Sequence, residues 1–463
     1  MKESLFQEFE EVSAKQWKQK IQFDLKGADY NEKLVYRSLD GIDVKPFYNA
    51  EDIEEPVKTP SPKNWSICEK IYVASVEKSN EKAKRVLEKG AESLWFIIPS
   101  EDVSPETLFA GLDLENTAIY LRLEFLSADY FKRLRTYLEG ENTKFYLHTD
   151  IIGNLARTGN WFHNLEKDHE LLEEIVQNSG RFQSVISVDA RLYQNAGANI
   201  PQQLAYSLAH VNEYLNHFDS FKNTDWKNDF LPQFLIASGP NYFFEIAKIR
   251  ALRWLYSTLA KEYQLPETCH ILAQPTKRNK TLYDYNVNLL RTTTESMSAI
   301  LGGADAIYNI PYDSFYHKNN EFGDRIARNQ LLVMKNEAYL DKVANAAEGA
   351  YYIESLTKQF AEMALDIFKE IEKGGGFMKQ LKAGVIQHKI KESATREQEL
   401  FDKGELVLIG TNKFENPQDK MENEIELYPF LKKDPRKTLI EPVLERRLSE
   451  NLEQERLKQE KAG

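Results

Sequence analysis

Cysteine is nearly absent from this chain. Cys68 and Cys269 are the only two cysteines among 463 residues, and they lie far apart. Neither belongs to a closely spaced pair of the kind that binds zinc or carries out redox chemistry. We interpret both as buried thiols of a protein from a reducing compartment, which predicts a cytoplasmic location.

The chain also lacks an excess of basic residues and any long hydrophobic run. Its formal net charge is −12, which argues against a nucleic acid as partner because phosphate binding needs a basic surface. Apolar runs such as LWFII (94–98) are too short to cross a bilayer. The N-terminal stretch MKESLFQEFEEV is acidic and has no apolar signal core, so we expect neither a targeting peptide nor a membrane partner.

What the chain does contain is a regular rhythm. Short runs rich in β-branched and aromatic residues alternate with stretches of helical periodicity. Most runs do not alternate between apolar and polar residues, as expected for strands covered on both faces. Eight runs separated by helices predict a (β/α)8 TIM barrel, with a doubly wound sheet as the alternative. The runs are 70–76, 93–98, 117–123, 144–149, 184–189, 234–238, 269–274 and 306–310.

The regions on either side of the barrel differ from it in composition. A proline-rich acidic linker, NAEDIEEPVKTPSP (49–62), follows an N-terminal arm. In the charged final stretch, Leu444, Leu448 and Leu452 fall on one face of a predicted helix, either a solvated surface helix or one that contacts a partner. The predicted parts are 1–62, N-terminal arm and linker; 63–330, barrel; 331–414, helical extension and linker; and 415–463, charged C-terminal tail and helix.

Residues 286–313, NVNLLRTTTESMSAILGGADAIYNIPYD, are the most regular part of the sequence. They predict a helix that ends at Gly302 and Gly303, followed by a strand and a polar exit at Tyr312 and Asp313. The polar exit lies at the carboxyl end of the strand, where barrels place their active sites.

Other polar residues follow predicted strands and should gather at the same face of the barrel. These residues are Asp150, Asp189, Ser238 and Gln274. Carboxylates and amides in this position serve as acids, bases or ligands in barrel enzymes. They also cap helices or line an inert barrel mouth, and the residues themselves leave both readings open.

Several charged residues interrupt apolar helical patterns. Arg291 and Glu295 have the spacing of an ion pair on one helix. Glu245, Lys248, Arg250 and Arg253 occupy an otherwise apolar helix and predict either a polar seam or a contact with a partner. His148 lies close to Asp150, but no third ligand is evident, so we interpret it as structural rather than metal-binding.

Five segments, in order, resemble the barrel chains of the methylmalonyl-CoA mutase family. The N-terminal stretch WKQKIQFDLKGADYNEKLVYRSLDGIDVKPFY (17–48) is similar to the small, or beta, subunit of the two-chain form of that family. The five segments are FLIASGPNYFFEIAKIRALRWLY (234–256), YDYNVNLLRTTTESMSAILGGADAIYN (283–309), DRIARNQ (324–330), IEKGGGFMKQLKAG (371–384) and LVLIGTNKF (406–414).

The resemblance implies the radical isomerisation of methylmalonyl-CoA to succinyl-CoA with adenosylcobalamin. In the catalytic chains a flavodoxin-like domain binds cobalamin through a histidine in an Asp-x-His-x-x-Gly motif. This chain has no such motif, and its sequence after Phe414 is too short and too charged for that domain. We therefore expect no cobalamin bound by this chain, and adenosylcobalamin in a large, or alpha, partner subunit. The histidines are His148, His163, His169, His210, His217, His270, His317 and His388.

The catalytic residues of the family are replaced as well. Leu192, within DARLYQNAGA (189–198), stands where catalytic chains have a histidine that contacts the thioester carbonyl. Leucine has no hydrogen-bond donor, so this electrostatic help is lost. The family's tyrosine motif has no match, and WFIIPSEDVSPE (95–106) occupies its expected place. Further departures are Lys277, Arg278 and Lys280 in QPTKRNKTLYDYN (274–286), and NAAEGAYY (345–352).

Bulky aromatic residues are frequent in the predicted strands, whereas small residues line the bore through which CoA passes in the catalytic chains. Large side chains that point inward would fill this bore. The aromatic residues concerned are Tyr72, Trp95, Phe96, Tyr120, Phe145 and Tyr146.

The resemblance and its departures favour a non-catalytic small subunit in a heterodimer with the large subunit. No catalytic residue is predicted for this chain, and its N-terminal arm and C-terminal helix are candidates for the contact with the partner. An alternative is a barrel that retains an acyl-CoA-binding or regulatory pocket, and an independent barrel enzyme is a third reading. The candidate pocket residues are Asp150, Asp189, Gln194 and Gln274.

Overall fold

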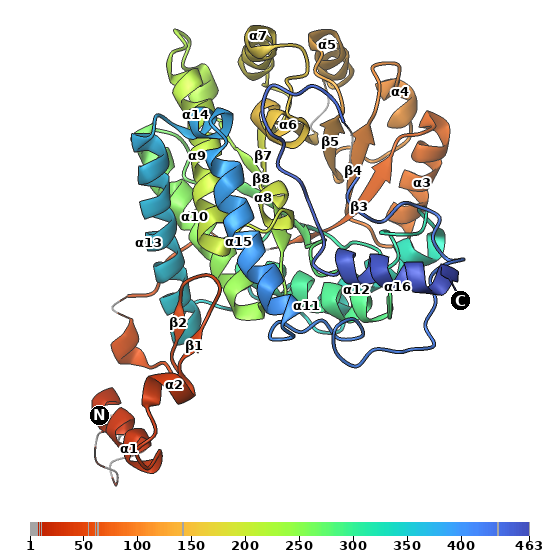
Figure 1. Ribbon diagram of the computed structural model, residues 1–463. Coiled ribbons are helices and arrows are strands. Elements are labelled where there is room, and N and C mark those ends of the chain that lie inside the picture. Colours follow the sequence, from red (N-terminus) through yellow and green to blue (C-terminus); the bar gives the residue numbers. More distant parts are fainter. Residues whose placement is uncertain are drawn as a thin grey trace.

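The computed structural model describes residues 8, 10, 12–53, 55–60, 62, 64–140, 143–432 and 435–462. Eight parallel strands form a closed barrel in the order β10-β3-β4-β5-β6-β7-β8-β9 (Figure 1). The predicted (β/α)8 barrel is confirmed, and closure excludes the doubly wound sheet. The strands are β3 (Ser66–Tyr72), β4 (Ser93–Ile98), β5 (Ala118–Leu123), β6 (Lys144–Thr149), β7 (Ser184–Asp189), β8 (Gln233–Ser238), β9 (His270–Pro275) and β10 (Ala306–Tyr308).

Helices surround the barrel and explain why its strands are hydrophobic on both faces. Every residue of β4, β7 and β8 is buried, because one face meets the bore and the other meets the helices. The helices that follow the strands are α3 (Val76–Glu88), α4 (Pro105–Leu108), α5 (Ala128–Tyr137), α6 (Ile151–Thr158), α7 (Leu165–Gln177), α8 (Arg191–Asn195), α9 (Ile200–Asp219), α10 (Tyr242–Glu262), α11 (Val287–Gly302) and α12 (Glu321–Asn336), with the short 3-10 turn η2 (Asp225–Lys227) after α9.

The two adjacent glycines in 286–313 have different roles. Gly303 ends α11 in the left-handed conformation, with φ of 92°, which glycine adopts without a steric penalty. Gly302 lies against α10, where an added Cβ would stand 2.9 Å from Cβ of Ile249. The polar exit is a turn: Asp313 is buried and its carboxylate accepts a hydrogen bond of 2.7 Å from the Asn320 amide.

The charged residues of α10 form an internal polar seam rather than a contact with a partner. Their side chains are buried and meet acids on the same helix, on α13 (Tyr351–Lys373), and in the turn before β10. Buried charges are tolerated only when they are paired in this way. The pairs are Lys248 with Glu245, Arg250 with Glu354 at 2.7 Å, and Arg253 with Asp305 at 2.7 Å.

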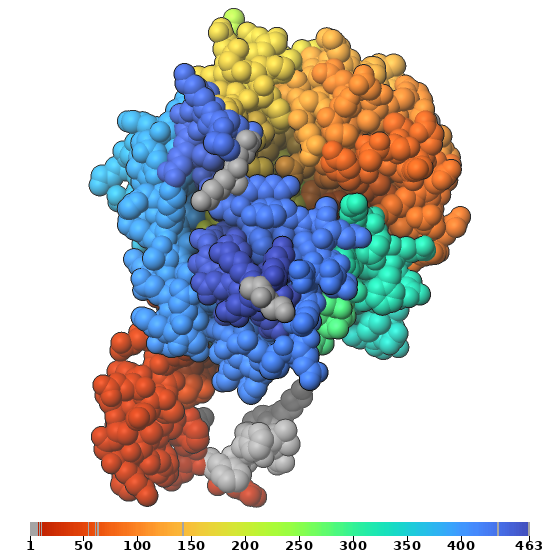
Figure 2. Space-filling model, turned by 45° about the vertical axis from the view of Figure 1, so that its right-hand side comes forward, coloured from red at the N-terminus to blue at the C-terminus, as the bar shows by residue number. Residues whose placement is uncertain are grey.

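After α13, the chain continues through α14 (Phe377–Lys382) and α15 (Val385–Asp402) and ends in α16 (Glu450–Ala462). The predicted helix through Leu444, Leu448 and Leu452 is wrong in its first half, because α16 begins only at Glu450. Residues 436–449 have no helix or strand and run across the barrel (Figures 1 and 2). We call residues 436–449 the strap.

The N-terminal arm stands away from the rest of the molecule (Figures 1 and 2). It is tied to the barrel where Oδ1 of Asp40 accepts a hydrogen bond of 2.7 Å from the backbone N–H of Ile200, at the start of α9. Its first helix has no buried residue. The arm consists of α1 (Ala14–Asp24), α2 (Tyr30–Leu34), β1 (Tyr36–Arg37), β2 (Asp43–Val44) and η1 (Ala50–Asp52).

Aromatic side chains fill the bore of the barrel. Tyr120 stacks on Tyr146 with ring centroids 4.9 Å apart, and its hydroxyl lies 2.9 Å from Nε2 of His270. Trp95 meets Tyr308 edge to face at 6.0 Å. These rings occupy the space that an eight-stranded barrel leaves between its strands.

The other aromatic residues of the strands point elsewhere. Phe96 and Phe145 face outward and pack on Phe109, with centroid distances of 5.6 and 5.2 Å. Tyr72 is largely exposed at the end of β3. Alternation along a strand therefore divides these residues between the bore and the helical layer.

We expect the Trp95→Ala substitution to lower the free energy of unfolding by about 3–5 kcal/mol, because it opens a cavity in the packed bore. The matched control is Tyr72→Ala, on an exposed ring of β3, which should change it by less than about 0.5 kcal/mol. Urea unfolding followed by circular dichroism measures both. Equal effects of the two substitutions would contradict a filled bore.

Candidate functional site

The strands end in a mouth whose polar groups are largely bound to one another. Asp150 follows β6 and caps α6: its Oδ1 accepts from the N–H of Gly153 at 2.7 Å. The same oxygen accepts from the hydroxyl of Tyr214 at 2.8 Å and lies 2.9 Å from Nε2 of His210. Oδ2 accepts from the N–H of Asp189 at 2.8 Å. Both carboxylate oxygens of Asp150 are therefore engaged in structural contacts.

Asp189 is the centre of an arginine cluster. Arg191 binds it with two hydrogen bonds of 2.6 and 2.7 Å. Arg157 adds a hydrogen bond of 2.6 Å, and Arg122 lies 3.9 Å away. Gln274 joins the cluster because its Oε1 accepts from Arg191 at 3.0 Å.

The ionisation of these carboxyl groups follows from their partners. Burial alone would raise the pKa of Asp189, but Arg191 and Arg157 hold it well below the usual range. Burial also opposes ionisation of Asp150, whose pKa is nevertheless lowered by His210 and by its hydrogen bonds. Both carboxylates stay charged at neutral pH, so neither is suited to act as a general acid or base.

Two other candidate residues lie outside this cluster. Oε1 of Gln194, in α8, accepts a hydrogen bond of 2.5 Å from the hydroxyl of Thr276, which positions the loop after β9. The hydroxyl of Ser238 lies 3.0 Å from that of Ser298 in α11, away from the arginines. The structure thus brings together Asp150, Asp189 and Gln274, but not Gln194 or Ser238.

The charged residues of the loop that begins at Lys277 form ion pairs with acids from other parts of the chain. Nζ of Lys280 is 2.7 Å from Oε2 of Glu295 in α11, and both side chains are buried. The predicted Arg291–Glu295 pair is therefore wrong, because Lys280 takes this carboxylate. Arg291 instead donates to the hydroxyl of Thr281 and to the carbonyl of Ile409, at 2.9 and 2.8 Å.

The strap closes over the mouth through backbone hydrogen bonds. The N–H of Val443 donates to the carbonyl of Ala156 in α6 at 2.8 Å, and that of Leu448 to the carbonyl of Arg278 at 2.9 Å. These contacts join it to the loops at the carboxyl ends of the strands, where Figure 2 shows the C-terminal residues in blue over the body.

Glu445 is the charged anchor of the strap. Its carboxylate lies 3.4 Å from Arg157 and 3.3 Å from Lys277, and it accepts from the Asn195 amide at 3.2 Å. Burial opposes ionisation, but Lys277 and Arg157 lower the pKa of Glu445 to about 2. The strap therefore adds a permanent negative charge to a mouth rich in cations.

A cavity of 270 Å³ lies at the mouth, lined in part by Arg122, Arg157 and Asp189. His148 also lines it, with both ring nitrogens buried and without a hydrogen-bond partner. Burial, together with the nearby Arg191, lowers the pKa of His148 to about 3, so the ring is neutral. Within the described residues, no three histidine, cysteine or acidic side chains are grouped to bind a metal.

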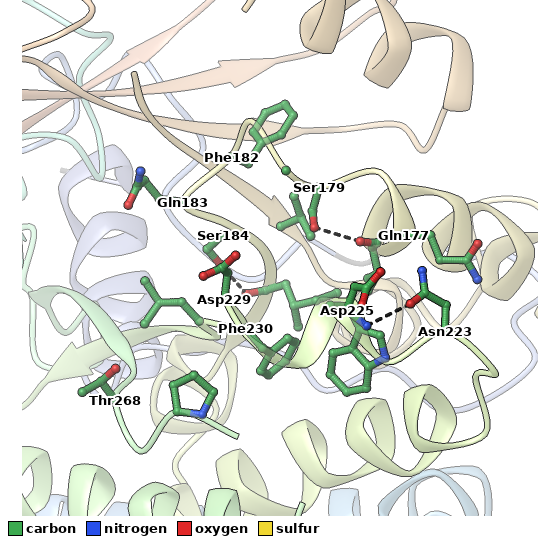
Figure 3. Close-up of a pocket in the computed structure, with 17 residues that line it drawn as sticks. Gln177, Ser179, Phe182, Gln183, Ser184, Asn223, Asp225, Asp229, Phe230 and Thr268 are labelled. Carbon is green, nitrogen blue, oxygen red and sulfur yellow. Dashed lines mark hydrogen bonds between the residues drawn. The ribbon is translucent and has the colours of Figure 1, made fainter. Parts of the chain in front are cut away.

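A wider cavity of 630 Å³ lies at the opposite end of the barrel. Figure 3 shows its lining, which comes from the end of α7, from the start of β7 and the loop before it, and from the loops that precede β8 and β9; it includes Gln177, Ser184, Asp225 and Thr268. Barrel chemistry takes place at the carboxyl ends of the strands. The smaller cavity at the mouth is therefore the candidate site.

The cations and the acid that define the mouth are not among the residues predicted from the sequence. Arg122 and Arg157 were not selected, nor was Glu445, which is distant in sequence. Arg122 lies one residue before the end of β5. Because it is two positions after the inward-facing Tyr120, strand alternation places it on the same, inner face of the barrel. No local pattern linked Glu445 to Arg157, because the two residues are 288 positions apart in the sequence.

The fold and the mouth together define a (β/α)8 barrel protein whose bore is filled with its own side chains. Residues 105–459 match the family model described as methylmalonyl-CoA mutase. The chain is 33% identical over 451 residues to the methylmalonyl-CoA mutase small subunit of Porphyromonas gingivalis, covering 90% of this chain and 72% of that one. This chain belongs to the methylmalonyl-CoA mutase family.

Two further relatives are similar over most of the chain. The methylmalonyl-CoA mutase small subunit of Streptomyces virginiae is 27% identical over 449 residues, or 89% of this chain and 72% of that one. The methylmalonyl-CoA mutase of Rhizobium meliloti is 27% identical over 472 residues, and here the match covers 89% of this chain but 65% of the relative.

A flavodoxin-like domain, the part that the sequence analysis associates with cobalamin binding in this family, is not found among the described residues. The strands of the described part belong either to the barrel or to the β1–β2 pair, so they supply no second parallel sheet for a flavodoxin-like domain. Leu192, which the resemblance places where catalytic chains have a histidine, is buried in the apolar core. Across the described part of the chain, each helix is too short or too polar to span a bilayer.

We expect Glu445→Gln to loosen the strap, because Arg157 and Lys277 lose their shared anion. Local opening should become easier by about 1–2 kcal/mol, so amides of residues 439–448 should exchange hydrogen roughly 5–30 times faster at pH 7. Glu441→Gln is the matched control, since Glu441 lies on the same strap with an exposed carboxylate. Hydrogen exchange measured by mass spectrometry that is unchanged in Glu445→Gln would contradict this anchor.

The same anchor predicts a pH dependence. A carboxyl whose pKa is depressed in the folded state contributes stability above its unfolded value, about 4.3, and this contribution is lost as the pH falls toward about 2. The difference in strap exchange between the wild type and Glu445→Gln should therefore shrink below about pH 4. A difference that persists undiminished at acid pH would show that the carboxylate is not the cause.

Proposed function

We propose that this chain is the non-catalytic small subunit of a heterodimeric, adenosylcobalamin-dependent methylmalonyl-CoA mutase. The large subunit would carry out the isomerisation of methylmalonyl-CoA to succinyl-CoA and hold the cofactor, and this chain would support it. The observation that carries the proposal is the filled bore. Trp95, Tyr120 and Tyr146 occupy the space that an acyl-CoA needs in a catalytic barrel.

The chemistry of the mouth supports the same conclusion. Asp150 and Asp189 are bound to His210 and to arginines, and Leu192 supplies no donor for a thioester carbonyl. The strap also lies where a substrate would enter. A barrel closed in this way is suited to a structural role beside an active partner.

The contact with the partner is assigned to the N-terminal arm. Trp17 and Phe23 of α1 are 50% and 79% exposed, and the helix also carries Lys15, Lys18 and Lys20. An exposed aromatic surface of this kind is typical of interfaces. The C-terminal helix offers less free surface, because Arg456 stacks on Tyr283 at 3.9 Å within the same chain.

The proposal includes the division of the chain into an arm and linker (1–62), a barrel (63–330), a helical extension (331–414) and a charged tail (415–463). It also includes a cytoplasmic location for the heterodimer. Cys68 and Cys269 are both free and buried, in keeping with a reducing compartment.

We expect co-expression with a methylmalonyl-CoA mutase large subunit to give a stable heterodimer with cobalamin-dependent isomerase activity. This chain alone should be inactive with added adenosylcobalamin. Complex mass and a succinyl-CoA assay measure both. Isomerase activity from this chain alone, or no association with the large subunit, would overturn the proposal.

A second experiment tests the arm. The double substitution Trp17→Ser and Phe23→Ser should weaken binding of the large subunit at least about tenfold, because aromatic anchors carry much of the energy of an interface. Leu165→Ser, on an exposed leucine of α7, is the control and should leave binding unchanged. Equal binding by the double variant would remove the arm from the interface.

The alternative function, a barrel with an acyl-CoA-binding or regulatory pocket, is favoured by one observation, the cavity of 270 Å³ at the mouth. Asp150 and Asp189 line it, whereas Gln194 and Gln274 do not. Calorimetry of the isolated chain with methylmalonyl-CoA distinguishes the two functions. Saturable binding would support the alternative, and its absence would support the filled barrel.

A further inference from the structure

Lys70 is an inward-facing lysine at the mouth of the barrel. Its neighbours in β3 point outward: Glu69 pairs with Arg328 of α12 at 3.0 Å, and Ile71 packs in the outer core. Nζ of Lys70 lies 4.4 Å from the ring centroid of Tyr308 and 5.7 Å from that of Trp95. The amine therefore rests on the aromatic filling of the bore, on the side that faces the mouth.

This amine has no counter-ion. Among the described residues, Nζ of Lys70 forms neither a hydrogen bond nor an ion pair, and its contacts are with the two aromatic rings. The acids of the mouth are engaged elsewhere, Asp189 by Arg191 and Arg157, and Glu445 by Lys277 and Arg157. Asp324 of α12 favours the charged amine, but it is paired with Lys82 at 2.6 Å, so the groups around Lys70 are mainly cations.

Burial and the surrounding positive charge both disfavour protonation of the Lys70 amine. Burial, followed by Lys277, Arg191 and Arg122, lowers the pKa of Lys70 to about 7. A large fraction of the side chain is therefore an uncharged amine at neutral pH, which is the nucleophilic form. Lys280 is also buried, but Glu295 is bonded to its ammonium group.

We propose that Lys70 captures small anionic carbonyl compounds, such as 2-oxo acids, as a Schiff base at the barrel mouth. The amine nitrogen attacks the carbonyl carbon to form a C–N bond. The carbonyl oxygen then leaves as water, taking both protons of the amine, and a C=N bond remains. The step is reversible and requires no oxidant or reductant.

The surroundings of Lys70 select this class of compound. Arg122, Arg191 and Lys277 create a positive field that raises the local concentration of anions. The amine lies over the rings of Tyr308 and Trp95, and the guanidinium of Arg191 lies 4.7 Å from the centroid of the same Trp95 ring. Arg122, one of these cations, also lines the cavity of 270 Å³ at the mouth, where its guanidinium can bind a carboxylate.

The test uses the full chain and glyoxylate as the probe. Glyoxylate is added with sodium cyanoborohydride, which reduces the Schiff base to a stable carboxymethyl group, and the modified lysines are identified by mass spectrometry of peptides. We expect Lys70 to be modified at least about tenfold faster than an exposed lysine such as Lys58 at pH 7, with a rate that rises through a midpoint near 7.

Three controls make the result decisive. Lys280 should remain unmodified, which separates a free amine from mere burial. Acetaldehyde, a neutral carbonyl compound, should show at least about fivefold less preference for Lys70, and Arg122→Gln should reduce the glyoxylate rate by a similar factor.

Modification of Lys70 no faster than that of Lys58 would overturn the proposal, and this result is read from the wild-type chain, whose fold no substitution has altered. Equal preference with acetaldehyde would overturn the assignment of an anionic ligand. Lys70→Arg keeps the cation on the aromatic rings and should abolish the modification at this position. These readouts need no partner subunit and no cobalamin, so they are independent of the proposed mutase function.

Discussion

An eight-stranded barrel encloses a narrow bore, and this space must be filled by a ligand or by side chains. In this protein Trp95, Tyr120, Tyr146 and Tyr308 fill it with rings that stack or meet edge to face. The other features of the molecule depend on that choice. Because aromatic rings fill the bore, the mouth is not the entrance to a channel, and most of its polar groups are paired with one another.

The pairing at the mouth follows electrostatic rules. Arg122, Arg157 and Arg191 surround the single carboxylate of Asp189, so a second anion is needed to balance the cluster. Glu445 supplies it from the far end of the chain and thereby fixes the course of the strap. A catalytic barrel would leave such cations free for a substrate, whereas here the protein itself occupies most of them.

Much of the architecture could be predicted from the sequence. Apolar runs without alternation gave the parallel barrel, and its segment order gave the family, because both are properties of the local pattern. Contacts between distant segments could not be predicted: the pairing of Glu295 with Lys280 rather than Arg291, and of Arg157 with Glu445, depends on tertiary packing. Leu444 has helical spacing with Leu448, but backbone bonds to the mouth hold this segment extended.

The exposed arm affects the solubility of the chain before it binds a partner. An eleven-residue helix with no buried side chain is marginal in water, and Trp17 and Phe23 are exposed on it. Under the proposed pairing with a large subunit, the unassembled chain exposes these aromatic side chains on a marginally stable helix. It is therefore the form most prone to self-association. Balanced synthesis of the two chains would then help to keep this chain soluble, because a bound partner covers the aromatic surface of the arm.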